Sequence, residues 1–398
     1  ELRLVVSSAT ALMAVRGYAS PETERAFARA RALCETMPPS AQLHPVLRGL
    51  VSYHHVRAEL DVAHELGELL LRHAAADPGD RTLATQAHYG HGATLFHQGA
   101  LEPARSQLEA ALAGYDRASH REHVGVYGGY DPGVACSLWL AWTLGLLGRL
   151  EEADRRSREG LELACTLGEP FSLAWAHYAM SVSHQLFGDW AASAGASGEA
   201  ARLAEEHGFP HVRGMALANH GWALVMQGRA GEGIATLRDG AALVDATGAA
   251  LVRPQYLGML AAADALQGDA AGAERRFDEA LELVERTGER LHEVGLLLGK
   301  SQLLVSTEQG ARARASARDA AAEGCLRRAL RTAREQGALL LELRVALALA
   351  RHLGQRDRAG EARSLLTAAL APFADAPPVV PEIPAARRLL VKLDGARG

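Results

Sequence analysis

The sequence predicts an all-α protein, built as a right-handed superhelix of antiparallel helix pairs. Glycines recur in two interleaved series with a period of 40 residues, one from Gly148 to Gly268 and one from Gly168 to Gly288. Each half-period is one helix length closed by a residue that tolerates a positive φ. A fixed period of this size is typical of repeat arrays. Alternating β-branched runs, which indicate strands, do not occur in the sequence.

Columns of small residues around the turn glycine indicate the type of repeat. Small residues stand five and twelve positions after this glycine and seven positions before it, where neighbouring helices must approach closely. The column seven positions before it holds Gly92, Ala141, Ser181, Gly221 and Ala261. These offsets match the tetratricopeptide (TPR) pattern, although the unit is longer than the roughly 34 residues of that repeat. The expected fold class is therefore a TPR-like α-solenoid with about 40 residues per repeat.

Composition excludes several function classes. The 398 residues are 48% hydrophobic and 5% aromatic, which suffices for a large helical core. The net charge is −5 and neither sign gathers into a long block, so no direct nucleic-acid partner is expected. The four cysteines are far apart, which is typical of reduced thiols in a cytoplasmic protein. The chain begins inside an expected helix, which indicates a piece of a longer protein.

We expect one continuous array over residues 1–398. Helices near residues 2–16 and 21–35 are followed by hairpins over 42–73 and 82–115. The predicted parts are N-terminal repeats (1–116), an insertion (117–131), regular 40-residue repeats (132–305), a mobile loop of charged low complexity (306–319), the last repeats (320–372), and a proline-rich segment with a capping helix (373–398).

The segment from Pro132 to Gly148 is uncharged over 17 residues, near the lower limit for crossing a bilayer. Ala141 and Gly148 fall in the repeat columns, however, so the segment is interpreted as a buried helix. No membrane partner is expected.

Several motifs of the regular repeats resemble a known region. They are Gly129-Tyr130-Asp131-Pro132-Gly133-Val134-Ala135-Cys136 with Leu140-Ala141-Trp142, Gly168-Glu169-Pro170-Phe171-Ser172-Leu173-Ala174, Glu206-His207-Gly208-Phe209-Pro210, and Glu285-Arg286-Thr287-Gly288-Glu289-Arg290. The chain resembles the C-terminal TPR-like repeat region of large bacterial multidomain signalling proteins. In that family a class III adenylate/guanylate cyclase, kinase or regulator domain precedes an AAA-type or STAND ATPase module. None of those upstream catalytic motifs stands in this sequence, so the resemblance implies a non-catalytic region.

Three local patterns imitate catalytic or metal sites. The segment Gly295 to Lys300 and Ser301 is one residue short of a P-loop and keeps the helix period. His88, His91 and His97 could hold zinc, but two of them share repeat offsets with other histidines, which favours packing in the core or groove. Asp131 before Pro132 fits a helix N-cap better than a catalytic loop. No cofactor, metal or enzymatic activity is expected.

The expected function is signal transduction through protein–protein interaction. The concave groove would bind a protein or peptide segment, including another domain of the same chain; the alternative is a sensor for a small molecule. The residues thirteen, ten and six positions before the turn glycine, with two neighbours, are expected to line the groove. These candidate binding residues are Gln86, Tyr89, Trp139, Trp142, Trp175, Tyr178, Met215, Asn219, Trp222 and Gln255.

The aromatic members of this set are the type enriched in binding hot spots. The alternative is that the rings pack between helices as ordinary core. The predicted groove contains no Lys or Arg, so we expect the partner to present an apolar or aromatic segment.

Overall fold

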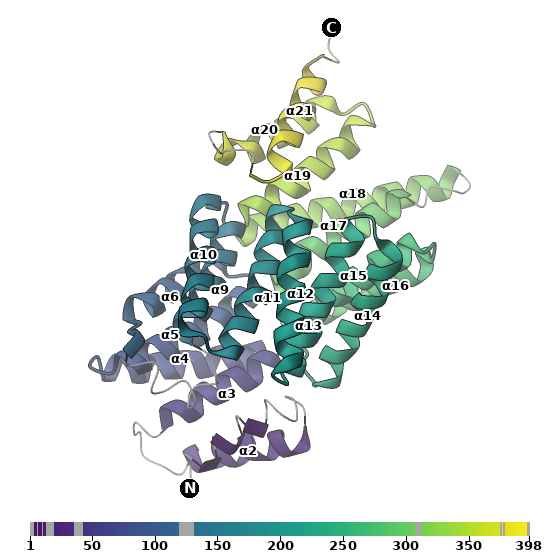
Figure 1. Ribbon diagram of the computed structural model, residues 1–398. Coiled ribbons are helices and arrows are strands. Elements are labelled where there is room, and N and C mark those ends of the chain that lie inside the picture. The colour runs from purple at the N-terminus through teal and green to yellow at the C-terminus, as the bar shows by residue number, and fades with distance from the viewer. Residues whose placement is uncertain are drawn as a thin grey trace.

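The computed structural model of the chain consists of helices and short connections. It describes residues 4–5, 7–9, 11–12, 20–35, 43–118, 131–306, 312–374, 376 and 379–395. Within these ranges there is no strand, and the helices follow one another as an antiparallel array (Figure 1). The predicted fold class, an all-α TPR-like solenoid, is confirmed.

In the described part of the chain, a first helix, α2, is followed by eight helix pairs and a final helix, α21. The bounds are α2 Pro21–Glu35; α3 His44–Val56 with α4 Leu60–Ala76; α5 Arg81–His97 with α6 Leu101–Gly114; α9 Pro132–Leu146 with α10 Leu150–Leu167; α11 Pro170–Phe187 with α12 Trp190–Glu206; α13 Pro210–Met226 with α14 Ala230–Ala246; α15 Arg253–Leu266 with α16 Ala270–Thr287; α17 Glu293–Ser306 with α18 Arg312–Glu335; α19 Leu339–Gly354 with α20 Ala359–Leu370; and α21 Glu382–Gly395.

The turns and the small columns explain why the helices pair. The turn glycines of both series adopt the left-handed conformation, with φ of 82° at Gly148 and 78° at Gly188. At the α13–α14 contact, a Cβ atom on Gly221 would lie 2.3 Å from the backbone nitrogen of Leu237 and 2.5 Å from the carbonyl oxygen of Gly233. The helices can therefore approach this closely only because these positions lack side chains.

Carboxylate side chains cap the N-termini of several helices. The Asp131 side chain accepts hydrogen bonds from the backbone N–H groups of Gly133 at 2.8 Å and Val134 at 3.1 Å, which caps α9. It also accepts a hydrogen bond from the Tyr115 hydroxyl at 3.0 Å. The interpretation of Asp131 as an N-cap, rather than part of a catalytic loop, is confirmed.

The C-terminal part of the array lies against earlier repeats, with α19 in contact with α9 (Figure 1). The Arg344 guanidinium of α19 donates to the carbonyl oxygen of Leu186 at the end of α11. Gly148 lies against the side chains of Leu339 and Phe373, and Gly188 lies against Pro381. These contacts join residues that are between 158 and 225 positions apart in the sequence.

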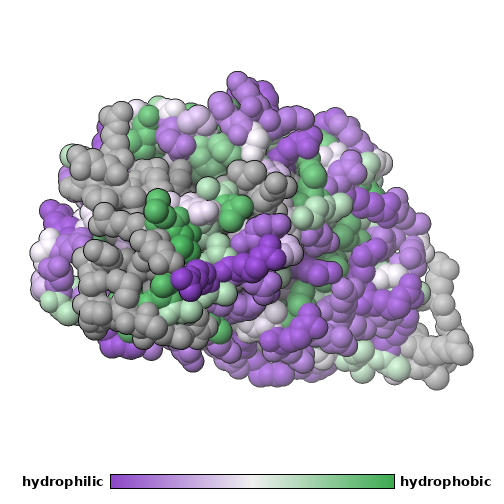
Figure 2. Space-filling model, turned by 90° about the horizontal axis from the view of Figure 1, so that it is seen from below, coloured by the Kyte–Doolittle hydropathy of each residue, from purple (hydrophilic) through white to green (hydrophobic). Residues whose placement is uncertain are grey.

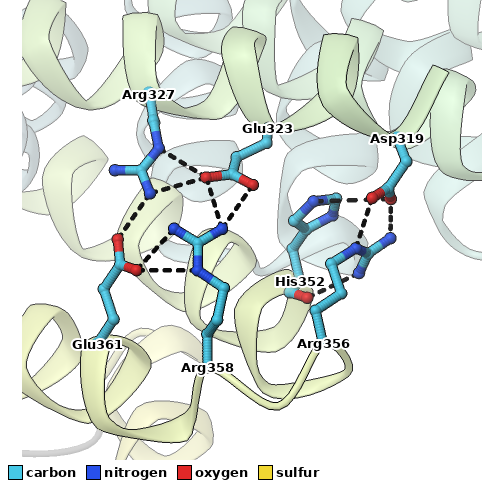
Figure 3. A network of polar contacts seen from close by, with 7 residues as sticks. All are labelled: Asp319, Glu323, Arg327, His352, Arg356, Arg358 and Glu361. Atoms are coloured by element: carbon cyan, nitrogen blue, oxygen red, sulfur yellow. Dashed lines mark hydrogen bonds and ion pairs between the residues drawn. The ribbon is translucent and has the colours of Figure 1, made fainter. Parts of the chain in front are cut away.

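The last repeats are held together by a network of ion pairs between α18, α19 and α20 (Figure 3). Arg358 donates to both oxygens of Glu323 at 3.0 and 2.9 Å, and Arg327 donates to Glu361 at 2.6 Å. Arg356 pairs with Asp319 in a two-bond contact.

Burial raises the pKa of Glu323, but the hydrogen bonds from Arg327 and Arg358 outweigh it, so the pKa lies below its usual range. The carboxylate is therefore charged and bridges two helices.

Some boundaries differ from the expectation. The predicted mobile loop 306–319 is wrong over most of its length, because α18 begins at Arg312. The arginine and alanine residues of this segment are strong helix formers, so the low-complexity sequence from Arg312 onward forms the first part of α18. Residues 307–311, most of the predicted insertion 117–131, and much of the predicted helix over 2–16 lie outside the described residues.

The buried-helix interpretation of Pro132–Gly148 is confirmed, because every residue of α9 is buried in the protein. In the described residues, no helix combines the length and apolarity that crossing a bilayer requires.

Candidate functional site

The inner face of the superhelix encloses a cavity of about 500 Å³, called the inner cavity below. Its wall is formed mainly by the first helix of successive pairs, from α5 to α17, with contributions from the end of α3 and from α19. First helices line the inside because a repeat array stacks its pairs with a small rotation at each step. Ion pairs such as Arg156–Glu159 on α10 and Arg202–Glu206 on α12 lie on the second helices. Hydrophilic residues cover much of the face that Figure 2 shows, with smaller hydrophobic patches between them.

Eight of the ten candidate residues line the inner cavity, and two do not. Those in the wall are Tyr89, Trp139, Trp142, Trp175, Tyr178, Met215, Trp222 and Gln255. Gln86 is buried against α3, where its side-chain oxygen accepts a hydrogen bond from Arg48 Nε at 3.2 Å. Asn219 is buried against α11 and donates to Ser181 Oγ at 3.2 Å. Both amides are therefore satisfied between helices and do not face the cavity.

Asn219 and Trp139 occupy the same offset, yet only Trp139 reaches the cavity. The offset lies at the border between the inner face and the preceding repeat, so the length of the side chain decides where it ends. The short amide of Asn219 stops at Ser181, whereas the indole of Trp139 extends to the wall.

All five tryptophans of the sequence line the inner cavity, the fifth being Trp190. Trp139 and Trp142 are edge to face with ring centroids 4.8 Å apart, and Trp175 and Tyr178 lie 5.3 Å apart. Trp142 is 5% exposed, whereas Trp175 and Trp222 are half-buried. The rings therefore pack in part against each other and in part face the cavity.

A contact between distant repeats bounds the inner cavity on one side. The carbonyl oxygen of Val56 at the end of α3 accepts hydrogen bonds from the backbone N–H groups of Ala250 and Leu251, both at 3.0 Å. Ala58 and Leu60 pack against Leu251 beside these bonds. We call this contact the clasp. It connects segments about 190 residues apart and brings Val56 and Leu251 into the cavity wall.

A buried carboxyl supports the clasp from the following repeat. Glu289 is 0% exposed and accepts a hydrogen bond from the backbone N–H of Val252 at 2.9 Å, while its second oxygen has no hydrogen-bond partner among the described residues. Burial raises the pKa of Glu289 to about 8, although the Val252 bond lowers it. Val252 adopts a left-handed conformation with φ of 59°, which is uncommon for a β-branched residue.

Most polar residues in the wall of the inner cavity, above all its histidines, were not predicted from the sequence. Four of them line the cavity: His55, His97, His211 and His292. Burial lowers the pKa of His97 and of His211 to about 4 and that of His292 to about 3, so all three are neutral near pH 7. Burial and the neighbouring His97 hold the pKa of His55 well below its usual range. The sequence offers no signal that joins these four, because they keep no common repeat offset.

One cation also lies in the wall, contrary to the expectation of a groove without Lys or Arg. Arg344 Nε donates to Glu382 at 2.7 Å, and the guanidinium also donates to the Leu186 carbonyl. Its charge is therefore already paired within the protein.

The metal and nucleotide alternatives have no support in the described part of the chain. His88 Nδ1 lies 2.7 Å from Gln107 Oε1, His91 packs against the ring of His64, and His97 faces the cavity, so the three do not converge. No group of three metal-ligating side chains gathers there. Lys300 lies within α17 and pairs with Asp278, so the P-loop-like segment is helical.

Comparison with known proteins finds similar sequences and folds. No family model matches the chain. An uncharacterised protein of Rhizobium meliloti (strain 1021) is 28% identical over 254 residues, which is 63% of this chain and 23% of that protein. The chain thus spans less than a quarter of the length of this curated relative.

Three solved structures share the fold. A Rap protein complexed with Competence and Sporulation Factor is 11% identical, with a TM-score of 0.53 over 99% of this chain and 98% of that one. NprR in complex with its cognate peptide NprX is 12% identical, with a TM-score of 0.56 over the same shares of both chains. The APC/C hetero-tetramer Cut9–Hcn1 is 17% identical, with a TM-score of 0.56 over 96% of this chain and 62% of that one. At these identities the likeness shows the fold alone.

Proposed function

We propose that this chain is a non-catalytic regulatory repeat domain that binds a short peptide segment in its inner cavity. The observation that carries the proposal is the gathering of all five tryptophans, with two tyrosines, on one cavity wall. Tryptophan and tyrosine supply large contact areas with few rotatable bonds, which is why they dominate binding hot spots. A structural core alone gives no reason for every indole to border the same empty space.

The size of the cavity selects among the expected partners. A volume of about 500 Å³ lies in the range of sites for small ligands, and is too small for a folded domain. A few residues of an extended segment, contributed by a separate peptide or a neighbouring part of the same protein, fit this space. The folds of the Rap protein and NprR cover nearly all of this chain, and these structures hold Competence and Sporulation Factor and the cognate peptide NprX, respectively.

The wider context follows the resemblance of the repeat motifs. We propose that the chain regulates a cytoplasmic signalling protein with an attached ATPase or nucleotide cyclase-type domain. The relative from Rhizobium meliloti is several times longer than the matched segment, which supports a multidomain parent. Ligand occupancy would then be passed to the attached domain through the repeat array.

A small-molecule sensor is the second candidate, and the volume and mostly apolar lining of the cavity favour it. Compact, mostly apolar pockets with few polar groups are typical of small-ligand sites, whereas peptide sites in repeat arrays are longer grooves.

Intrinsic tryptophan fluorescence tests the proposal directly, because every indole borders the cavity. Capped tetrapeptides with leucine or phenylalanine side chains, and without tryptophan, are titrated into the protein at pH 7.5. We expect a saturable change that is lost in Trp222→Ala. The matched control is Leu266→Ala, which truncates a side chain that is 63% exposed and outside the cavity wall.

The outcomes separate the candidates. Saturable binding by peptides alone supports the peptide proposal. If only non-peptide compounds bind, the sensor for a small molecule replaces it. If the fluorescence responds to none of them, the array is a scaffold without an occupied inner site.

A further inference from the structure

A polar corner interrupts the apolar wall of the inner cavity. It is formed by His55 at the end of α3, His97 at the end of α5 and Trp139 in the middle of α9. All three are more than nine-tenths buried, with exposed fractions of 9%, 2% and 5%. The ring centroids of His55 and His97 lie 4.8 Å apart, and those of His97 and Trp139 lie 5.1 Å apart. Three repeats thus bring their polar rings to one point.

The hydrogen bonds of this corner determine the tautomer of His97. Its Nδ1 atom lies 3.1 Å from the carbonyl oxygen of Ala93 and 3.0 Å from His55 Nε2. A carbonyl oxygen can only accept, so Nδ1 carries the proton. A neutral imidazole protonated at Nδ1 has a bare acceptor at Nε2.

The donor beside this acceptor is also unused. Trp139 Nε1–H has no hydrogen-bond partner among the described residues, although buried indole N–H groups normally have one. Trp142, three residues further along α9, illustrates the usual arrangement, because its Nε1–H donates to the Ala179 carbonyl oxygen at 3.1 Å. The corner therefore places one unpaired donor, Trp139 Nε1–H, beside the His97 ring, whose Nε2 is an acceptor when Nδ1 carries the proton.

The wall has no free charge to complement an ion. The four histidines are neutral near pH 7, and the guanidinium of Arg344 is paired with Glu382. A charged ligand group would lose its hydration without gaining a counter-ion, which strongly opposes its entry.

We infer that the inner cavity selects an uncharged ligand with an amide group, whose carbonyl oxygen accepts from Trp139 and whose N–H donates to His97. The apolar part of the ligand lies among the rings of Trp142 and Trp175. This inference rests on the proposed binding function and specifies the ligand class. It extends to peptides, in which a backbone amide with no nearby terminus meets the same requirement.

Four phenylalanine-related probes test the inference by fluorescence titration of the intact chain at pH 7.5. N-acetyl-phenylalanine amide is neutral and has amide groups, N-acetyl-phenylalanine is an anion, phenethylamine is a cation, and ethylbenzene has neither charge nor amide. We expect the neutral amide to bind about tenfold more tightly than each of the others, the size of one net hydrogen bond.

Two matched variants locate the amide contact. Trp139→Phe removes the unpaired donor and keeps an aromatic ring, so it should weaken binding of the neutral amide about tenfold and leave ethylbenzene unchanged. Trp142→Phe removes an indole N–H that is already paired with Ala179, so the preference for the amide should persist. Circular dichroism of both variants checks that they fold.

Two results would overturn the inference. Equal affinity for ethylbenzene and the neutral amide, or for a charged probe and the neutral amide, would contradict this ligand class while leaving the proposed binding function in place. If no probe binds at all, including ethylbenzene, the inference fails, and the tetrapeptide titration decides the proposed function separately.

Discussion

At the scale of single residues, the neutral histidines of the cavity wall make stability depend on pH. The pKa of His97 is about 4 in the folded protein and about 6.5 in an unfolded chain. Between these values the unfolded state binds the proton and the folded state does not. Stability is therefore lost as the pH falls from about 6.5 to about 4, by up to about 1.4 kcal/mol per pH unit for each such histidine.

His97→Gln should make this dependence weaker. The amide of glutamine does not titrate, so the decrease in melting temperature between pH 7 and pH 4.5 should be smaller in the variant than in the natural sequence. Thermal unfolding followed by circular dichroism measures both. An unchanged slope would show that His97 does not contribute to the acid sensitivity.

Glu289 makes stability depend on pH in the opposite direction. Its pKa of about 8 in the folded protein exceeds the value near 4.5 of a free side chain, so the folded state binds the proton more tightly. Stability from the neutral carboxyl is present below pH 4.5 and is lost as the pH rises through about 8.

Glu289→Gln keeps an oxygen for the Val252 N–H and remains neutral at all pH values. Its melting temperature relative to that of the natural protein should increase from pH 5 to pH 9. A difference that is constant over this range would contradict a raised pKa.

At the scale of helices, the columns of small residues determine how closely the two helices of a pair can pack. Gly221→Ala would place a methyl group 2.3 Å from the backbone of Leu237, where no flexible side chain can move away. We expect a loss of stability of about 3 kcal/mol, at the upper end of the usual cost of overpacking.

The control is Gly195→Ala in α12, where an added methyl group meets no atom within 4 Å. This exposed position should gain about 0.5–1 kcal/mol, because alanine is the better helix former. Urea unfolding of both variants gives the two values. If Gly221→Ala were neutral, the α13–α14 pair would have to be able to separate without cost.

At the scale of the whole molecule, contacts between successive turns of the superhelix add to those between neighbouring repeats. An array with neighbour contacts only would open locally from its ends. Here the clasp joins α3 to residues 249–252, and α19 lies against the end of α11. The inner cavity exists because these contacts close the superhelix.

Hydrogen exchange tests the clasp. Leu60→Ala removes a fully buried side chain that packs beside the Val56–Leu251 contact, so the amides of Ala250 and Leu251 should exchange faster. The matched control is Leu108→Ala in α6, which is equally buried but is not a member of the cluster of Ala58, Leu60 and Leu251. Equal acceleration of these amides in both variants would indicate global unfolding instead.

The repeat architecture and most of the inner face could be predicted from the sequence because both depend on local periodicity. The glycine period determined the helix lengths, and helical geometry determined which offsets face the axis, so eight of ten candidate residues line the cavity. The exceptions, Gln86 and Asn219, have side-chain amides that hydrogen-bond to Arg48 and Ser181 between helices. The start of α18 was misplaced because low complexity was interpreted without regard to helix propensity.

The sequence by itself therefore determined the fold class, the helix pairs and the aromatic character of the inner face. Only the tertiary structure decided that the clasp bounds the groove on one side, that His55, His97 and Trp139 meet, and that Glu289 is buried under the clasp. The physical reason is that these features depend on superhelical curvature, which accumulates from small rotations over about 200 residues. Short-range sequence patterns do not predict the sum of those rotations. Residues that share no repeat offset therefore come together only in the folded array.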